Sequence, residues 1–221
     1  MAEQGEVVLL DEWLSMYGTR ARIALAEKGI KYEFKEEHLD NKSPLLLQMN
    51  PIHKKIPVLI HKGKPICESL IIVQYIDEVW NHTAPLLPSD PYIKAQALFW
   101  ADFVNKKVGD VGGRIWAGKK EEREEAKKEL IQSLKQLEET LGVKNFFGGE
   151  RFDFVDIALI PFYAWFYTFE ELGNFKVEAH CPKLIAWAHR CLQRPSVSKS
   201  LASEKEIYDF VVGFRQKHQL D

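Results

Sequence analysis

The hydrophobic pattern changes character part-way along the chain. Up to residue 83, short apolar or alternating runs typical of strands are interleaved with stretches of helical period. Beyond residue 91 the apolar residues recur with a period of 3.6 throughout. The intervening stretch is rich in proline and polar residues, as linkers are. The sequence therefore predicts a domain of residues 1–83, a linker of residues 84–91 and a second domain of residues 92–221.

The first part of the chain begins with a predicted β-α-β unit. Residues 7–10 form an apolar run typical of a buried strand, and residues 20–28 follow with helical period until Gly29 ends them. Residues 31–35 then alternate polar with aromatic, which is a strand pattern. A strand, a helix and a second strand are expected in that order.

Four further elements complete this domain. Ser43-Pro44 begins a brief helix that Asn50-Pro51 ends. Residues 57–60 and 65–67 are expected to form a hairpin, and a helix capped by Ser69 follows it up to Val79. The predicted order is β-α-β-α-β-β-α, an α/β domain.

The second domain is expected to be all-helical. The apolar residues Ala126, Leu130, Leu134, Leu137 and Leu141 form one stripe opposite a charged face, which we interpret as solvated surface. A helix start is predicted at Asp153, with Asp156 completing a capping box and with Phe152 and Ile157 placed as a hydrophobic staple. Residues 157–169 are apolar on nearly every side and should form the central buried helix, and residues 182–192 and 204–216 supply two more.

Composition and charge exclude several classes of partner. The chain has 221 residues, 46% hydrophobic and 28% charged, with a net charge of −2 and no basic face for nucleic acid or a membrane surface. The first six residues are acidic, and no apolar run approaches the ~20 residues of a membrane span. A cytoplasmic protein with small-molecule or protein partners is expected. Because Cys67, Cys181 and Cys191 lie far apart, we interpret them as buried thiols.

Familiar catalytic motifs are absent from the sequence. The seven histidines show no metal-ligand spacing, and neither a P-loop nor a dinucleotide-binding glycine motif occurs. We therefore expect neither a metal site nor nucleotide chemistry.

The most informative polar pair is Glu68-Ser69, at the junction between the predicted hairpin and the next helix. The first N–H groups of that helix could hold a carboxylate, and Glu68 could hold an ammonium, as the end of an amino acid or peptide requires. For the dipeptide alone, an ordinary capped helix is the better explanation.

Ser15 lies in the loop between the first strand and the first helix, the edge at which open α/β sheets bind ligands. On position alone it could be only a turn or cap residue. With no His/Asp partner at recognisable spacing, activation of Ser15 as an acyl nucleophile is not expected.

Several stretches together carry a family resemblance that covers nearly the whole chain. They are Ser15 with Tyr17-Gly18 and Arg20, residues 41–44, residues 50–58, residues 66–69 and residues 154–159. In their order and spacing the sequence is similar to the cytosolic glutathione transferases, and more narrowly to the plant Tau class. The resemblance implies a thioredoxin-like N-terminal domain, an all-α C-terminal domain and a homodimer.

The resemblance also implies a binding site for the tripeptide glutathione as co-substrate, without a resident cofactor. Ser15 would be the catalytic hydroxyl, donating a hydrogen bond to the glutathione thiolate. The other implied contacts are Lys42 and Lys55 to the glycine carboxylate, the Ile56 backbone, beside a cis Pro57, to the cysteinyl amide, and Glu68 with Ser69 to the γ-glutamyl group.

Simple energetics support a serine in that role. A thiol with a pKa near 8.5 needs a drop of about two units, or about 2.7 kcal/mol, to ionise at neutral pH. A hydrogen bond to a charged acceptor supplies about 1.5 to 3 kcal/mol and a helix N-terminus about 0.3 to 1 more, so no general base is required.

The second substrate, a small hydrophobic electrophile, is expected against apolar surface between the two domains. The candidate residues are Trp13, Tyr17, Gly109, Gly113, Trp116, Trp165 and Phe210, although each aromatic alone is more often a core residue. Met16 replaces a frequent proline of the Tau pattern, and Gly109 and Gly113 stand where relatives often carry tyrosine and arginine. A roomier and less polar electrophile site is our hypothesis.

Three functions remain open at this point. The leading one is glutathione conjugation to hydrophobic electrophiles, with reduction of organic hydroperoxides through the same thiolate as a side activity. The alternative is a non-catalytic carrier, or ligandin, of apolar molecules, which explains the glycines but not the retained hydroxyl. A thioredoxin-like interaction module would tolerate loss of Lys42, Glu68 and Ser69, all of which are present.

Overall fold

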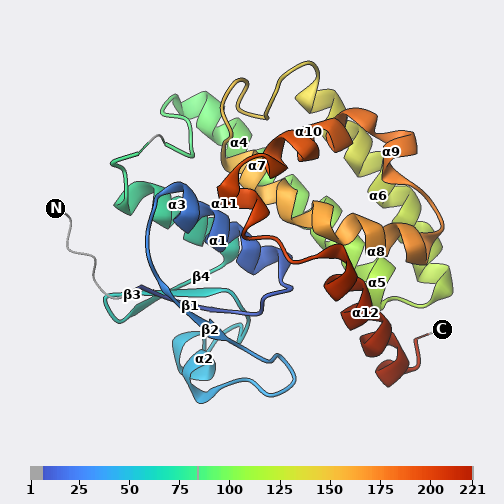
Figure 1. Ribbon diagram of the computed structural model, residues 1–221, viewed down its shortest axis with the longest axis horizontal. Coiled ribbons are helices and arrows are strands. Elements are labelled where there is room, and N and C mark those ends of the chain that lie inside the picture. The colour runs from blue at the N-terminus through green and yellow to red at the C-terminus, as the bar shows by residue number, and fades with distance from the viewer. Residues whose placement is uncertain (1–6, 84, 221) are drawn as a thin grey trace. The chain divides into compact units, whose positions relative to one another are not determined.

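The computed structural model describes residues 7–83 and 85–220 (Figure 1). The chain divides into two compact units, residues 1–87 and residues 88–221. The acidic segment of residues 1–6 and position 84 of the expected linker lie outside the described residues.

The first unit is built on a four-stranded sheet with the strand order β2-β1-β3-β4. Its strands are β1 (Val7–Asp11), β2 (Glu33–Glu36), β3 (Val58–His61) and β4 (Lys64–Cys67). β2 runs parallel to β1, whereas β3 is antiparallel to both β1 and β4. Its helices are α1 (Met16–Glu27), α2 (Pro44–Met49) and α3 (Ser69–Val79), and the predicted order of strands and helices is confirmed.

Both faces of the sheet are covered. Figure 1 shows α1 and α3 side by side on one face and α2 on the other. On the α2 side, residues of β1 and β3 form a core cluster with Leu46: Val8, Leu10, Val58 and Ile60. Because strand side chains alternate, Leu9 and Leu59, both fully buried, point to the opposite face.

Two helix starts of the first unit differ from the prediction. α1 begins at Met16, four residues before position 20, because Ser15 caps it and makes the glycine-containing stretch its first turn. Ser69 is not the N-cap of α3 but its first helical residue; the cap position is Glu68, which has φ +70° and makes no side-chain capping bond. The left-handed backbone at Glu68 turns the chain directly from β4 into the helix.

The end of the first unit is fixed by a buried ion pair. Lys28 Nζ lies 2.7 Å from a carboxylate oxygen of Asp77. The same carboxylate accepts from the backbone N–H groups of Leu86 and Leu87, both at 2.9 Å. Part of the expected linker is therefore packed and hydrogen-bonded rather than free.

The second unit is helical, as predicted. Its elements are α4 (Pro91–Val104), the π-helical η1 (Asn105–Gly109), α5 (Asp110–Ala117), α6 (Lys120–Leu141), α7 (Phe154–Leu159), the 3₁₀ turn η2 (Ile160–Phe162), α8 (Tyr163–Gly173), α9 (Val177–His180), α10 (Pro182–Leu192), α11 (Pro195–Ser198) and α12 (Glu204–His218). The apolar stripe of α6 from Ala126 to Leu141 is buried, which confirms the reading of its charged face as surface.

One prediction for this unit is wrong and one is confirmed. Residues 157–169 do not form a single helix, because Pro161 has no N–H to donate and the run is divided among α7, η2 and α8. The capping box is present: Asp153 accepts from the Val155 and Asp156 N–H groups, and the Asp156 carboxylate accepts from the Asp153 N–H at 2.8 Å.

The cysteines are all free thiols. Cys181 and Cys191 are buried as predicted, and burial raises the pKa of Cys181 to about 12. Cys67 is only half-buried, because it is the last residue of the edge strand β4.

Residues 7–83 and 85–220 contain no helix that is long and apolar enough to cross a membrane. Nor do three or more of their His, Cys, Asp or Glu side chains gather as a metal site would need.

Candidate active site

The polar residues singled out in the first unit converge on one end of the sheet. Strand pairing places Leu10 beside Val58 and Val58 beside Cys67. Ser15 follows β1 at this end, the Ile56-Pro57 step enters β3 there, and Glu68 follows the last residue of β4. β2 also ends there, since Asp11 pairs with Glu36. Loops connected to all four strands therefore lie together at this end of the sheet.

Ser15 is the N-cap of α1, so the structural role considered for it is real. Its hydroxyl oxygen accepts from the Gly18 N–H at 3.1 Å, and its own N–H donates to the Glu12 carbonyl at 2.8 Å. A hydroxyl has two lone pairs and one hydrogen, and the cap uses only a lone pair. The half-buried Ser15 can therefore cap the helix and donate to a ligand at the same time.

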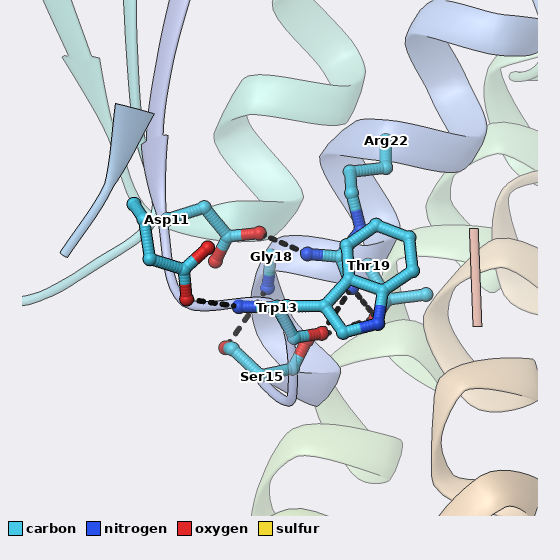
Figure 2. Close-up of polar contacts among 7 residues, drawn as sticks. Asp11, Trp13, Ser15, Gly18, Thr19 and Arg22 are labelled. Carbon is cyan, nitrogen blue, oxygen red and sulfur yellow. Dashed lines mark hydrogen bonds and ion pairs between the residues drawn. The ribbon is translucent and has the colours of Figure 1, made fainter. Parts of the chain in front are cut away.

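A buried guanidinium lies behind the Ser15 loop (Figure 2). Arg22 Nη1 pairs with the Asp11 carboxylate, and Arg22 Nη2 donates to the Trp13 carbonyl at 2.7 Å and to Thr19 Oγ1 at 2.6 Å. The guanidinium carbon also lies 4.4 Å from the centre of the Trp13 ring. One side chain thus contacts the strand, the loop and the first helical turn.

Asp11, the partner of Arg22, is fully buried from solvent. Burial raises the pKa of Asp11 to about 7, while the Arg22 charge opposes the rise. A Cβ at Gly18 would overlap the Asp11 carboxylate, so the absence of a side chain there gives the carboxylate its place on the first turn of α1.

The Ile56-Pro57 peptide bond is cis, as the resemblance implies. Asn50 Nδ2 donates to the Lys55 carbonyl at 2.9 Å, and Asn50 Oδ1 accepts from the His53 N–H at 3.1 Å. Lys55 is exposed and Ile56 half-buried. The buried Asn50 therefore fixes the loop that brings Lys55 and Ile56 to the end of the sheet.

Lys42 precedes the cap of α2 in the loop that follows β2. The next residue, Ser43, donates its hydroxyl to Glu37 at 2.6 Å and accepts from the Leu46 N–H at 3.0 Å. Glu37 is buried, so it fixes the turn from which the half-buried Lys42 extends.

Glu68 and Ser69 lie at the start of α3, and a cation stands behind them. Arg20 Nη1 donates to the Ser69 hydroxyl at 3.0 Å. Arg20 is fully buried, and burial lowers its pKa to about 10, which still leaves it charged at neutral pH. Glu68 is exposed, so its carboxylate is available at the surface next to this positive group.

The aromatic candidates fall into the two units. In the first, Trp13 lies under Arg22, and the Arg20 guanidinium lies 5.3 Å from the centre of the Tyr17 ring. In the second, Trp116 of α5 is the hub of a cluster, with ring-centre distances of 5.7 Å to Trp165 and 6.5 Å to Phe210. Phe214 joins the cluster at 5.1 Å from Trp116 and was not anticipated.

Gly109 and Gly113 lie in helical context, as expected. Gly109 ends η1 and is buried, and Gly113 is a half-buried residue of α5. A Cβ at Gly113 would meet nothing within 4 Å.

Comparison with known proteins decides the family. Residues 5–78 match the glutathione S-transferase N-terminal domain and residues 85–195 the glutathione S-transferase C-terminal domain. The chain is 64% identical to glutathione S-transferase 3 of Glycine max over 207 residues, 94% of each chain. The chain belongs to the glutathione transferases, in the plant Tau class.

Two solved structures agree with this assignment. The Tau class glutathione S-transferase from mango (Mangifera indica) is 43% identical, with a TM-score of 0.86 over 93% of this chain and 96% of its own. Rice GST1, solved in complex with glutathione, is 49% identical, with a TM-score of 0.93 over 98% of this chain and 99% of its own. This Tau-class chain is therefore a transferase enzyme with a thioredoxin-like domain followed by a helical domain.

In this glutathione transferase, the buried charged residues behind the candidate site were not predicted from the sequence. Asp11, Arg20, Arg22 and Glu37 are charged yet buried, and no periodicity distinguishes them from surface residues. The one available indication was Gly18 beside Arg20, since a glycine can mark a place where another group approaches the backbone closely.

Proposed function

We propose that this Tau-class transferase conjugates reduced glutathione to small hydrophobic electrophiles, with the Ser15 hydroxyl donating to the glutathione thiolate. The observation that carries the proposal is the convergence of Ser15, the cis Ile56-Pro57 step and Glu68-Ser69 on one end of the sheet. They provide a hydroxyl, a backbone segment and a polar pair, in the order that a γ-glutamyl tripeptide needs.

The remaining contacts follow from charge. The Glu68 carboxylate would hold the γ-glutamyl ammonium, while Ser69 and the N–H groups at the start of α3 would hold its carboxylate, with the Arg20 charge behind them. The Ile56 backbone would pair with the cysteinyl amide. Lys42 and Lys55 extend from loops at the same end of the sheet and would meet the glycine carboxylate.

Ser15 and α1 together supply enough energy to ionise the thiol. Because Ser15 is the N-cap, a thiolate that accepts from its hydroxyl also lies at the positive end of a helix of 12 residues. A charge-assisted hydrogen bond of about 1.5 to 3 kcal/mol plus about 0.3 to 1 kcal/mol from the helix end meets the ~2.7 kcal/mol needed for a two-unit drop in pKa. Glutathione is thus a co-substrate, and the mechanism needs no further cofactor. The same thiolate would reduce organic hydroperoxides.

The electrophile is proposed to pack against aromatic residues, including the cluster around Trp116 in the second unit. Trp165 and Phe210 flank that residue, and the open space at Gly113 supports a roomy site for it. An apolar pocket discriminates by only about 1 to 3 kcal/mol per methylene-sized change, so a range of electrophiles is expected.

We also propose a homodimer, as the resemblance implies. In support, α4 exposes several large apolar side chains, of which Tyr92 is 70% exposed and Phe99 57%. A groove of about 480 Å³ lies between α4 and α6, lined by Phe99, Trp100, Phe103, Gln136, Glu139 and Thr140. Exposed apolar patches of this kind mark association surfaces. Sedimentation equilibrium of the wild type and of Phe99→Glu tests this proposal. A dimer of unchanged stability in the variant would show that α4 is not part of the interface.

A substrate panel tests the proposed reaction against the carrier alternative. Purified wild type and Ser15→Ala are assayed with glutathione and an aryl halide, an isothiocyanate and an organic hydroperoxide, and each is titrated with a fluorescent apolar ligand. We expect turnover by the wild type and a sharp loss in Ser15→Ala at pH 6.5, with ligand binding retained. Absence of turnover with all three substrates, with ligand binding intact, would instead establish the carrier.

A further inference from the structure

The position of the Ser15 hydroxyl depends on its main chain, and one residue, Thr19, supplies two hydrogen bonds to the Ser15 carbonyl. The Ser15 carbonyl accepts the Thr19 N–H at 3.0 Å, the first hydrogen bond of α1. It also accepts the Thr19 hydroxyl at 2.8 Å. Thr19 thus holds the peptide plane of Ser15 with two donors, and that plane fixes the direction in which the Ser15 side chain leaves the backbone.

Thr19 is in turn held by Arg22. Arg22 Nη2 donates to Thr19 Oγ1 at 2.6 Å, and with that oxygen occupied as an acceptor the Thr19 hydroxyl hydrogen is directed to the Ser15 carbonyl. The same nitrogen donates to the Trp13 carbonyl at 2.7 Å, on the other side of Ser15. Figure 2 shows both branches meeting at the guanidinium.

The Arg22 guanidinium is itself fixed by contacts on its edge and on its face. Its second nitrogen pairs with Asp11, which is fully buried at the end of β1, and its face lies over the Trp13 ring. Arg22 and Thr19 are also almost completely buried, at 1% and 3% exposure. Neither residue can touch an electrophile in solution, yet both connect the sheet to the residue that would meet the thiol.

We propose that Thr19 and Arg22 are positioning residues that aim the Ser15 hydroxyl at the glutathione sulfur. The inference rests on the proposed role of Ser15. A planar guanidinium presents its donors on separate nitrogens in a rigid fork that reaches the Asp11, Trp13 and Thr19 acceptors, whereas an ammonium carries all its donors on one atom. Catalytic groups tolerate displacements of only about 0.5 Å, so a loosened Ser15 main chain weakens the bond to the thiolate without removing it.

Thr19→Val and Thr19→Ser separate positioning from folding. Valine keeps the shape of threonine and deletes the hydroxyl, whereas serine keeps the hydroxyl. A control for the loss of a buried polar contact in the same unit is Lys28→Met, which breaks the pair with Asp77 and leaves the Ser15 loop alone. Arg22→Lys is the second probe should Thr19→Val fail to fold, because it retains a positive charge beside Asp11.

The readout is the pH profile of kcat/KM with an aryl halide, which reports the apparent pKa of the glutathione thiol in the enzyme. Thr19→Val and Arg22→Lys should raise that pKa by about 0.5 to 1 unit, less than the about 1 to 2 units expected of Ser15→Ala. Rates at pH 6.5 should then fall about 2- to 6-fold and return toward the wild type above the shifted pKa, as they cannot if the fold is damaged. Thr19→Ser and Lys28→Met should keep the wild-type profile.

The outcomes separate the two proposals. A wild-type pKa in Thr19→Val and Arg22→Lys together with a raised pKa in Ser15→Ala overturns the positioning role and leaves the function of Ser15 standing. An equal rise in Lys28→Met also overturns it, since the effect would then come from general loosening. A wild-type pKa in Ser15→Ala refutes the proposed function itself.

Discussion

The Asp11 carboxylate occupies the space where Gly18 would carry a side chain. This contact joins the end of β1 to the first turn of α1 and lets Asp11 reach Arg22. Gly18→Ala should therefore destabilise the first unit by about 1 to 3 kcal/mol, the usual range for an overpacked buried position.

Gly113→Ala is the matched control for this prediction. It is also a helical glycine, but its added Cβ meets nothing within 4 Å. Alanine should there stabilise the helix by about 0.5 to 1 kcal/mol. Denaturant unfolding of both variants measures the two changes in the free energy of unfolding, which should have opposite signs. Equal effects at the two positions would disprove the contact between Asp11 and Gly18.

The buried Asp11 predicts a pH dependence of stability. Because its pKa is raised to about 7 by burial, the folded carboxyl stays protonated over a range in which the unfolded one, with an ordinary pKa of 3.8, has ionised. Unfolding then releases a proton, so the free energy of unfolding falls as the pH rises between about 4 and 7, by at most about 1.4 kcal/mol per pH unit.

Asp11→Asn should remove that slope while leaving the other titrations in place. Urea unfolding at intervals from pH 4.5 to 8 for the two proteins gives the difference directly. A difference that stays constant with pH, or that grows in favour of the wild type as the pH rises, means that Asp11 is charged in the folded protein throughout.

Ser69→Ala tests the anchor of the γ-glutamyl group. The substitution removes the acceptor of Arg20 Nη1 and a proposed donor to the ligand carboxylate. Loss of a hydrogen bond to a charged group is worth about 1.5 to 3 kcal/mol, so KM for glutathione should rise roughly 10-fold or more while kcat with saturating glutathione changes little. A fall in kcat at unchanged KM would place Ser69 in the chemical step instead.

The absence of side chains at Gly109 and Gly113 predicts that the enzyme accepts bulky electrophiles as well as small ones. Adding side chains in a Gly109→Tyr, Gly113→Arg double variant should reduce turnover of bulky apolar electrophiles more than turnover of small ones, because the side chain at position 113 occupies space that is open in the wild type. Kinetics with a graded series of aryl halides and isothiocyanates measure the ratio. Equal or better turnover of small electrophiles with no loss for bulky ones would count against a roomy site.

Local rules made most of the fold predictable from the sequence. The Ser43-Pro44 start of α2 and the Asp153 capping box were both predicted correctly, because the residues that form each of them lie within four positions of one another. The division of residues 157–169 shows the limit of periodicity, since hydrophobicity on every side hid the effect of Pro161.

Only the residues of the candidate site that would contact glutathione were predictable from the sequence; the buried residues that hold them in place were not. Ser15, Ile56 and Glu68 follow or precede strands, and strand order alone brings them together. The contacts that fix them join distant positions: Arg20 reaches Ser69 across 49 residues. Buried charges look like surface charges in a sequence, so only the structure places Arg22 behind the Ser15 loop.

The most direct test of the account is the pKa of the glutathione thiol in its complex with the wild type and with Ser15→Ala. It is measured by titrating thiolate absorbance near 240 nm in difference spectra of the binary complexes. We predict a thiol pKa about two units below the ordinary 8.5 in the wild type and a value about 1 to 2 units higher in Ser15→Ala. The same lowered pKa in both proteins, with glutathione bound in both, would contradict it.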